Sequence, residues 1–100
     1  MAKERIFAVV GLGTFGMEVA NVLAAKGGKV IALDNQEDMI EKVKDSVTQA
    51  ILVDSTDAEA LKNVPLSDVD VAVIAMGENI EASILTTVVF RPIGVPYIVA

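Results

Sequence analysis

Cysteine, histidine and tryptophan are all missing from this sequence of 100 residues. Without cysteine the chain can form neither a disulfide nor a zinc–thiolate site, and a reducing compartment is permitted. Histidine is the commonest general acid or base near neutral pH, so its absence removes the usual centre of proton-transfer catalysis. The composition therefore favours a binding protein over an enzyme.

Long apolar runs and an excess of positive charge are missing too. No apolar stretch approaches the roughly 18 residues of a membrane-spanning helix. Residues 1–5 lead straight into a strand-like segment, so we expect no signal peptide. The formal net charge is −6, which disfavours binding to nucleic acid or to an anionic lipid surface. These absences disfavour a signal peptide, a membrane-spanning helix and a nucleic-acid partner.

Aliphatic side chains are abundant instead. Hydrophobic residues make up 53% of the chain and aromatic residues only 4%, a composition that suits a parallel sheet covered by helices on both faces. Short apolar runs alternate with amphipathic stretches along the chain. We expect one domain over residues 1–100, with strands at 6–10, 30–33, 50–53, 71–75 and 97–99 and helices at 14–26, 36–44, 57–63 and 80–91.

This alternation predicts a Rossmann-type α/β fold, in which a doubly wound parallel sheet has the strand order 3-2-1-4-5. Thr56 and Glu59 have the spacing of a capping box for the third helix, and Asn79 can cap the fourth. Helical periodicity predicts that two apolar faces pack on the sheet: Phe15, Val19, Val22 and Leu23 in the first helix, and Ile80, Ile84, Leu85 and Val88 in the last.

The most specific motif is the G-x-G-x-x-G formed by Gly11, Gly13 and Gly16. It follows a buried strand, opens a helix and precedes Asp34 at the end of the second strand, which is the full context of a dinucleotide-binding fingerprint. Gly11 would allow the tight turn, Gly13 would let phosphates approach the backbone amides, and Gly16 would let the helix pack close to the sheet. The alternative is that the glycines only make a tight turn.

Asp34 is predicted to accept hydrogen bonds from ribose hydroxyls. Residues 35–38 contain no lysine or arginine to receive a 2′-phosphate, and a carboxylate would repel one, so NADP is expected to bind poorly. The alternative is that Asp34 or Asn35 only caps the second helix.

Polar residues also follow the third and fourth strands. Asp54 would accept a hydrogen bond from the adenine amine or from a ribose hydroxyl, while residues 76–79 would border the other half of a dinucleotide or a terminal phosphate. The alternative in both segments is helix capping, by Ser55, Thr56 or Asn79. The candidate nucleotide-binding residues are Gly11, Gly13, Thr14, Phe15, Gly16, Asp34, Asn35, Asp54, Ser55, Thr56, Met76, Gly77, Glu78 and Asn79. No catalytic or metal-binding residue is predicted.

Residues 7–16, Asp34 and residues 53–57 together resemble the regulatory RCK domain, also called KTN or TrkA-N. Residues 73–83, 86–87 and 94–99 strengthen the resemblance, because a generic dehydrogenase does not share this second block. The pattern is most similar to KtrA/TrkA-type subunits of potassium uptake systems. Thr14 stands where many relatives have an arginine that could clamp a terminal phosphate, and this departure favours a dinucleotide over ATP.

The resemblance implies a cytosolic regulatory domain that binds NAD(H) or ATP/ADP and controls a potassium-conducting membrane protein at the inner face of the cell membrane. It also implies self-assembly into dimers or eight-membered rings. Relatives continue into a sixth strand and a C-terminal region, so the resemblance implies a domain truncated after strand 5. Two rival hypotheses are the cofactor-binding half of an NAD-dependent dehydrogenase and a pure assembly module with a vestigial site.

Overall fold

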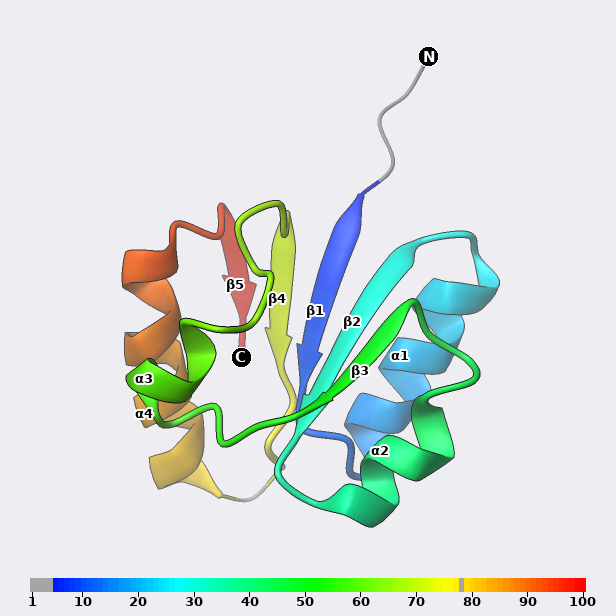
Figure 1. Cartoon of the computed structure of the whole chain (residues 1–100), viewed down its shortest axis with the longest axis horizontal. Coiled ribbons are helices and arrows are strands. Elements are labelled where there is room, and N and C mark those ends of the chain that lie inside the picture. The colour runs from blue at the N-terminus through cyan, green and yellow to red at the C-terminus, as the bar shows by residue number, and fades with distance from the viewer. Residues whose placement is uncertain (1–4, 78) are drawn as a thin grey trace.

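The computed structural model describes residues 5–77 and 79–100, and it shows one parallel sheet between two layers of helices (Figure 1). The sheet has the order β3-β2-β1-β4-β5, as the sequence predicts. Every neighbouring pair of strands is parallel. The strands are β1 (Ile6–Val10), β2 (Lys29–Asp34), β3 (Gln49–Leu52), β4 (Val71–Ile74) and β5 (Tyr97–Val99). The helices are α1 (Thr14–Ala25), α2 (Glu37–Val43), α3 (Ala58–Leu61) and α4 (Ile80–Phe90), with a 3-10 turn at Arg91–Ile93.

The alternation of side chains along β1 and β2 builds a core on each face of the sheet. Ala8 and Val10 of β1 pack in one cluster with Leu61 of α3 and Phe90 of α4. Val9, between them in the sequence, packs in the other cluster with residues of α1 and α2. Figure 1 shows the same division, with α1 and α2 on one side of the sheet and α3 and α4 on the other. Both faces of β1 are therefore buried, which explains its continuous apolar run.

The predicted core face of α1 is partly wrong. Phe15 is 66% exposed and Val22 is 43% exposed, whereas the buried residues of the helix are Gly16 and Ala20. The smallest side chains face the sheet because α1 approaches β1 closely, and bulky residues on that row would hold the two apart. The end of α1 is as predicted: Gly27 and Gly28 donate backbone hydrogen bonds to the carbonyls of Ala24 and Leu23, and these bonds close the last turn.

The predicted core face of α4 is wrong. The four residues expected to pack on the sheet are instead 46–70% exposed: Ile80, Ile84, Leu85 and Val88. Thr86 and Phe90 are the buried residues of the helix. Nearly every turn of α4 is apolar on more than one side, so periodicity alone could not tell which side meets the sheet. An exposed apolar stripe of Ile80, Ile84 and Val88, which we call the α4 stripe, is the result.

Helix caps decide the remaining boundaries. The predicted capping box of Thr56 and Glu59 is wrong, because Asp57 is the N-cap of α3 and its carboxylate accepts from the amides of Glu59 and Ala60. Asn79 caps α4 as predicted, since its side chain accepts from the amide of Ala82. In the described part of the chain no helix has both the length and the apolarity to cross a bilayer.

Candidate functional site

A cleft of about 440 Å³ opens at the carboxyl ends of the strands, over the point between β1 and β4 where the strand order reverses. In open α/β sheets this switch point is where ligands bind, and the volume lies within the range of small-molecule sites. The described residues that line it are Gly11, Leu12, Gly13, Asp34, Asn35, Gln36, Asp54, Thr56, Ala75, Met76, Gly77, Asn79 and Ala82.

Most of the residues predicted from the sequence therefore lie together, although they come from four separate segments. Ser55 lines a small recess that adjoins the cleft, and Gly16 is buried under the glycine loop. Thr14 and Phe15 do not line the cleft: Thr14 borders a separate hollow, and the Phe15 ring is exposed. Glu78 lies outside the described residues.

Sequence reasoning missed some residues of the cleft wall, namely Leu12, Gln36, Ala75 and Ala82. Leu12 and Gln36 donate their backbone amides to Asp34, a role that depends little on residue type, and the side chains of Ala75 and Ala82 are single methyl groups. No residue type in the sequence could signal such roles. Adjacency to the motif was the only available signal for Leu12, which lies between Gly11 and Gly13.

The three glycines of the motif are required for different reasons. Gly11 has a φ of +95°, and a Cβ there would lie 2.5 Å from the carbonyl oxygen of Ala75. A Cβ on Gly16 would lie 1.8 Å from the carbonyl oxygen of Gly11. Among the described residues, a Cβ on Gly13 would meet no atom within 4 Å. Packing therefore explains Gly11 and Gly16, whereas Gly13 keeps open a space that the protein itself does not fill.

The N-terminus of α1 differs from those of α2, α3 and α4 because it has no acidic residue in its first turn. Gly13 provides no side-chain cap, and the first turn contains no acidic residue. Each of the other three helices has an acidic residue in its first turn. The first amides of a helix have no acceptor within the helix and carry the positive end of its dipole. At α1, which borders the cleft, these amides are left for an external anion.

Asp34 ties the glycine loop to the end of β2. Its Oδ2 accepts a hydrogen bond from the amide of Leu12 at 2.7 Å, and its Oδ1 accepts from the amide of Gln36 at 2.8 Å. Gln36 is the N-cap of α2 and no side chain caps this helix, so neither Asp34 nor Asn35 is its cap; the bond to the Gln36 amide closes a turn just before α2. Each carboxylate oxygen can accept a second hydrogen bond, so this role leaves Asp34 able to bind a ribose hydroxyl as well.

Asp54 faces the cleft with one oxygen still free. Its Oδ1 accepts from the Thr56 hydroxyl at 2.6 Å and from the Thr56 amide at 3.0 Å. Among the described residues nothing donates a hydrogen bond to its Oδ2. The hydroxyl first, and then the amide, lowers the pKa of Asp54 below its ordinary value, because both stabilise the ionised form. The carboxylate stays charged and ready to accept a hydrogen bond near neutral pH.

Removing the Thr56 hydroxyl tests this arrangement. In Thr56→Val we expect the pKa of Asp54 to rise toward its ordinary value, because the largest cause of the lowering is lost. The ionised Asp54 favours the folded state, and this contribution fades only as pH falls through the lowered pKa. In Thr56→Val, the contribution of ionised Asp54 to stability therefore begins to be lost at a higher pH. A carbon NMR titration of the carboxyl group gives the pKa.

Thr87→Val is the control. It removes a hydroxyl that bonds the Ser83 carbonyl and should leave the pKa of Asp54 unchanged. An unchanged value in Thr56→Val would contradict the assignment.

The charge in the cleft is unbalanced. Asp34 and Asp54 line it, whereas none of its described lining residues is a lysine or an arginine. Lys42 lines the separate hollow that Thr14 also borders, and it does not line the cleft. A phosphate-bearing ligand would thus be attracted by backbone amides and the α1 dipole alone, and an additional phosphate near Asp34 would be repelled.

The family follows from comparison with known proteins. A family model described as the TrkA-N domain matches residues 7–100. The chain belongs to the TrkA-N family. It is 43% identical over 95 residues to Ktr system potassium uptake protein C of Bacillus subtilis, and 38% identical over 92 residues to Ktr system potassium uptake protein A of Vibrio alginolyticus. These alignments cover 95% and 92% of the chain but only 42% of each relative, so this TrkA-N chain spans less than half of their length.

A solved structure has the same fold. The NAD(P)-binding domain of an exopolyphosphatase-related protein from Archaeoglobus fulgidus superimposes with a TM-score of 0.80 and 26% identity. The match covers 92% of the TrkA-N chain and 68% of that structure. The resemblance inferred from the sequence motifs is thus confirmed at the level of the family and of the Rossmann-type fold.

Proposed function

We propose that this TrkA-N chain is the nucleotide-sensing part of a potassium uptake system. It binds an adenine nucleotide in the cleft between β1 and β4 and regulates a potassium-conducting membrane protein from the cytoplasmic side. It does not catalyse a reaction on the nucleotide. The names of its relatives support the potassium system, and the lack of histidine supports a role without acid–base catalysis.

The observation that carries the proposal is the open space at Gly13. A Cβ at Gly13 would clash with no atom in the part of the chain that the structure describes, and the φ of Gly13 is −68°, so neither this packing nor backbone strain requires a glycine there. The space lies at the uncapped N-terminus of α1, where a phosphate can approach the backbone. A glycine that the folded chain does not need is best explained by a ligand that does need it.

NAD(H) is the proposed ligand in preference to ATP. The described part of the cleft offers phosphates only backbone amides, and Thr14 borders a different hollow. The two phosphates of a dinucleotide can share the single helix N-terminus, whereas a triphosphate brings more charge toward the carboxylates of Asp34 and Asp54. Asp34 would hold the adenosine ribose, and Asp54 with Thr56 would border the adenine.

Self-association is also part of the proposed function. The α4 stripe leaves Ile80, Ile84 and Val88 more than half exposed on one side of the domain. Apolar stripes of this kind are typical of protein–protein contacts. A sensor acts on a partner only when the nucleotide has different affinities for two arrangements of the assembly, so the proposal requires both the cleft and an assembly surface.

Calorimetric titration with NAD, NADH, ATP, ADP and NADPH in one buffer tests the ligand. We expect NAD or NADH to bind, and NADPH to bind more than about tenfold more weakly, because its 2′-phosphate would approach Asp34. In Asp34→Asn, one amide hydrogen would face the amide of Leu12 or Gln36. We expect both a weaker affinity for NAD and a smaller ratio of the NAD affinity to the NADPH affinity.

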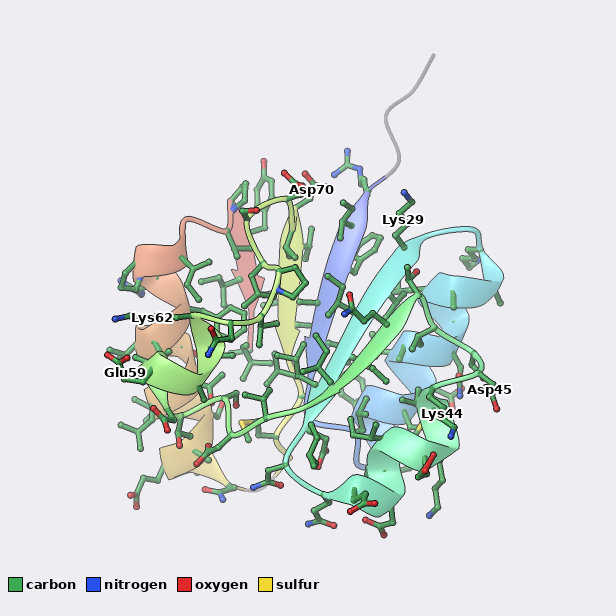
Figure 2. The ribbon with its side chains drawn as sticks, in the orientation of Figure 1. Lys29, Lys44, Asp45, Glu59, Lys62 and Asp70 are labelled. Atoms are coloured by element: carbon green, nitrogen blue, oxygen red, sulfur yellow. The ribbon has the colours of Figure 1, made fainter. Side chains whose placement is uncertain are left out.

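Asp70→Asn is the matched control. Asp70 is a half-buried carboxylate that accepts a backbone hydrogen bond from Ile6 at 2.8 Å, and it lies at the opposite end of the strands from the cleft (Figure 2). Its replacement should reduce stability without changing either affinity. If none of the nucleotides binds at millimolar concentration, the proposed ligand is wrong and the assembly module is favoured. Hydride transfer from bound NADH to an added carbonyl compound would favour the dehydrogenase.

A further inference from the structure

A chain of hydrogen bonds runs through the core behind the cleft. The Ser55 hydroxyl lies 2.9 Å from the Thr86 hydroxyl, and the Thr86 hydroxyl donates to the sulfur of Met76 at 3.3 Å. Thr86 is 0% exposed and Ser55 is 5% exposed. Three segments far apart in the sequence meet here: the loop after β3, the loop after β4 and the middle of α4.

The direction of these hydrogen bonds follows from their chemistry. A thioether sulfur has no proton to donate, so the single hydroxyl proton of Thr86 goes to Met76. Ser55 must then donate to Thr86, whose oxygen accepts. The order Ser55 to Thr86 to Met76 leaves neither buried hydroxyl without a partner, in agreement with the absence of unsatisfied side-chain atoms among the described residues.

Thr86 differs in this respect from its neighbour Thr87. The Thr87 hydroxyl donates to the Ser83 carbonyl one turn earlier at 2.8 Å, which is the usual bond of a threonine within a helix. The Thr86 hydroxyl instead contacts two loops outside α4. Two threonines on the same helix thus provide one residue that links loops and one that does not.

Both ends of the chain reach the cleft. Ser55 directly follows Asp54, which lines the cleft and is expected to contact adenosine. Met76 lines the cleft and the adjoining recess, next to the turn at Gly77. The two loops face each other across the ligand space, and Thr86 is bonded to both without being part of the wall.

We propose that Thr86 is a positioning residue of the nucleotide cleft, which sets the placement of Asp54 through Ser55 and of Met76 through its sulfur. The inference rests on the proposed nucleotide-binding function. Apolar side chains of the same size would fill this space, but their contacts are not directional. Hydrogen bonds from hydroxyl groups depend on distance and angle, so they hold both loops in one relative position. A nucleotide that moves either loop must then displace Thr86, and this displacement reaches the helix that carries the α4 stripe.

The test compares Thr86→Val, Thr86→Ser and Thr87→Val with the unchanged chain. Two quantities are measured: the affinity for NADH, and the NMR signals of the Met76 methyl group and the Thr56 amide in the ligand-free protein. We expect Thr86→Val to bind NADH roughly three- to tenfold more weakly and to shift both signals. Thr86→Ser keeps the hydroxyl, so its NADH affinity and its two NMR signals should be close to those of the unchanged chain. Thr87→Val should change neither the affinity nor the signals.

A double variant separates positioning from stability. Thr86→Val alone leaves the Ser55 hydroxyl buried without an acceptor, which lowers stability. Adding Ser55→Ala removes that orphan group, so the double variant should melt at a higher temperature than Thr86→Val while its NADH affinity stays low. Recovery of the affinity together with the melting temperature would overturn the inference and leave only a structural role.

The two measurements also distinguish this inference from the proposed function. If the unchanged chain binds none of the nucleotides, the proposed function fails, and the ligand-free signals still report whether Thr86 places the two loops. If the unchanged chain binds NADH and Thr86→Val binds it equally well with unshifted signals, the inference fails and the proposed function stands.

Discussion

Gly13→Ala is expected to abolish tight nucleotide binding while the domain keeps its fold. The added methyl group would meet no atom of residues 5–77 and 79–100 within 4 Å, so it would occupy the space into which the phosphates are expected to fit. Forcing an extra methyl group into an occupied space costs about 1–3 kcal/mol, which corresponds to roughly a ten- to hundredfold loss of affinity, and we expect a loss near the upper end of that range for NADH. Calorimetry measures the affinity, and thermal melting measures the stability.

The stability of Gly13→Ala should change little. Gly13 is the N-cap of α1 with a φ of −68°, which alanine adopts without strain. The weaker N-cap preference of alanine costs about 1 kcal/mol at most.

Gly27→Ala is a control that is expected to show the reverse pattern. Gly27 also has no neighbour within 4 Å, but its φ of +88° disfavours any side chain. It lies at the far end of α1, so that variant should lose stability and retain its affinity for NADH.

Equal NADH affinities in Gly13→Ala and the unchanged chain would contradict the assignment of the phosphate site. The cleft would then bind its ligand elsewhere, or the open space at Gly13 would be incidental. A loss of affinity that is matched by a large fall in melting temperature would also contradict it, because the effect would then come from the fold.

Gly16→Ala is expected to destabilise the whole domain. The new Cβ would lie 1.8 Å from the carbonyl oxygen of Gly11 and 2.8 Å from its carbonyl carbon. Both are backbone atoms of the glycine loop, so α1 would have to move away from β1. We expect a loss of about 3 kcal/mol, at the upper end of the usual cost of overpacking. For a domain of this size such a loss lowers the melting temperature by more than about 10 °C.

The direction of the change makes this prediction sharp. In an exposed helix interior, replacing glycine by alanine ordinarily stabilises by about 1 kcal/mol, because alanine has the higher helix propensity. At Gly16 the close approach of α1 to the sheet reverses the sign. A melting temperature of Gly16→Ala at or above that of the unchanged chain would show that α1 can shift without cost, and the packing role of Gly16 would be wrong.

Local patterns in the sequence were enough to predict the sheet and most of the residues that line the cleft. Buried strands on both faces of a parallel sheet need continuous apolar runs, and those runs gave β1 and β2 closely. The glycine loop and Asp34 could be predicted because their chemistry depends on residue type at a fixed spacing. The carboxyl ends of parallel strands meet at one edge, so a predicted strand order also predicted that these residues converge.

Side-chain partners across long sequence separations could not be predicted in the same way. The exposed side of α4 was wrongly assigned because both sides of that helix are apolar. Only tertiary packing selects Phe90, which joins a cluster with residues of β4, and Thr86, which bonds two loops. Ser55 has the sequence signature of a capping residue, yet its hydroxyl bonds Thr86 on another element. Periodicity and spacing contain no information about such a contact.

The sequence by itself determined the order of the strands, the nucleotide fingerprint and the absence of histidine and cysteine chemistry, because each depends on local residue type and spacing. Only the tertiary structure decided that Gly13 borders open space while Gly16 does not, and that Asp34 holds the glycine loop. It also decided that Thr86 joins the two walls of the cleft. The physical reason is that these properties depend on which atoms from distant segments come within contact distance, and folding alone sets those distances.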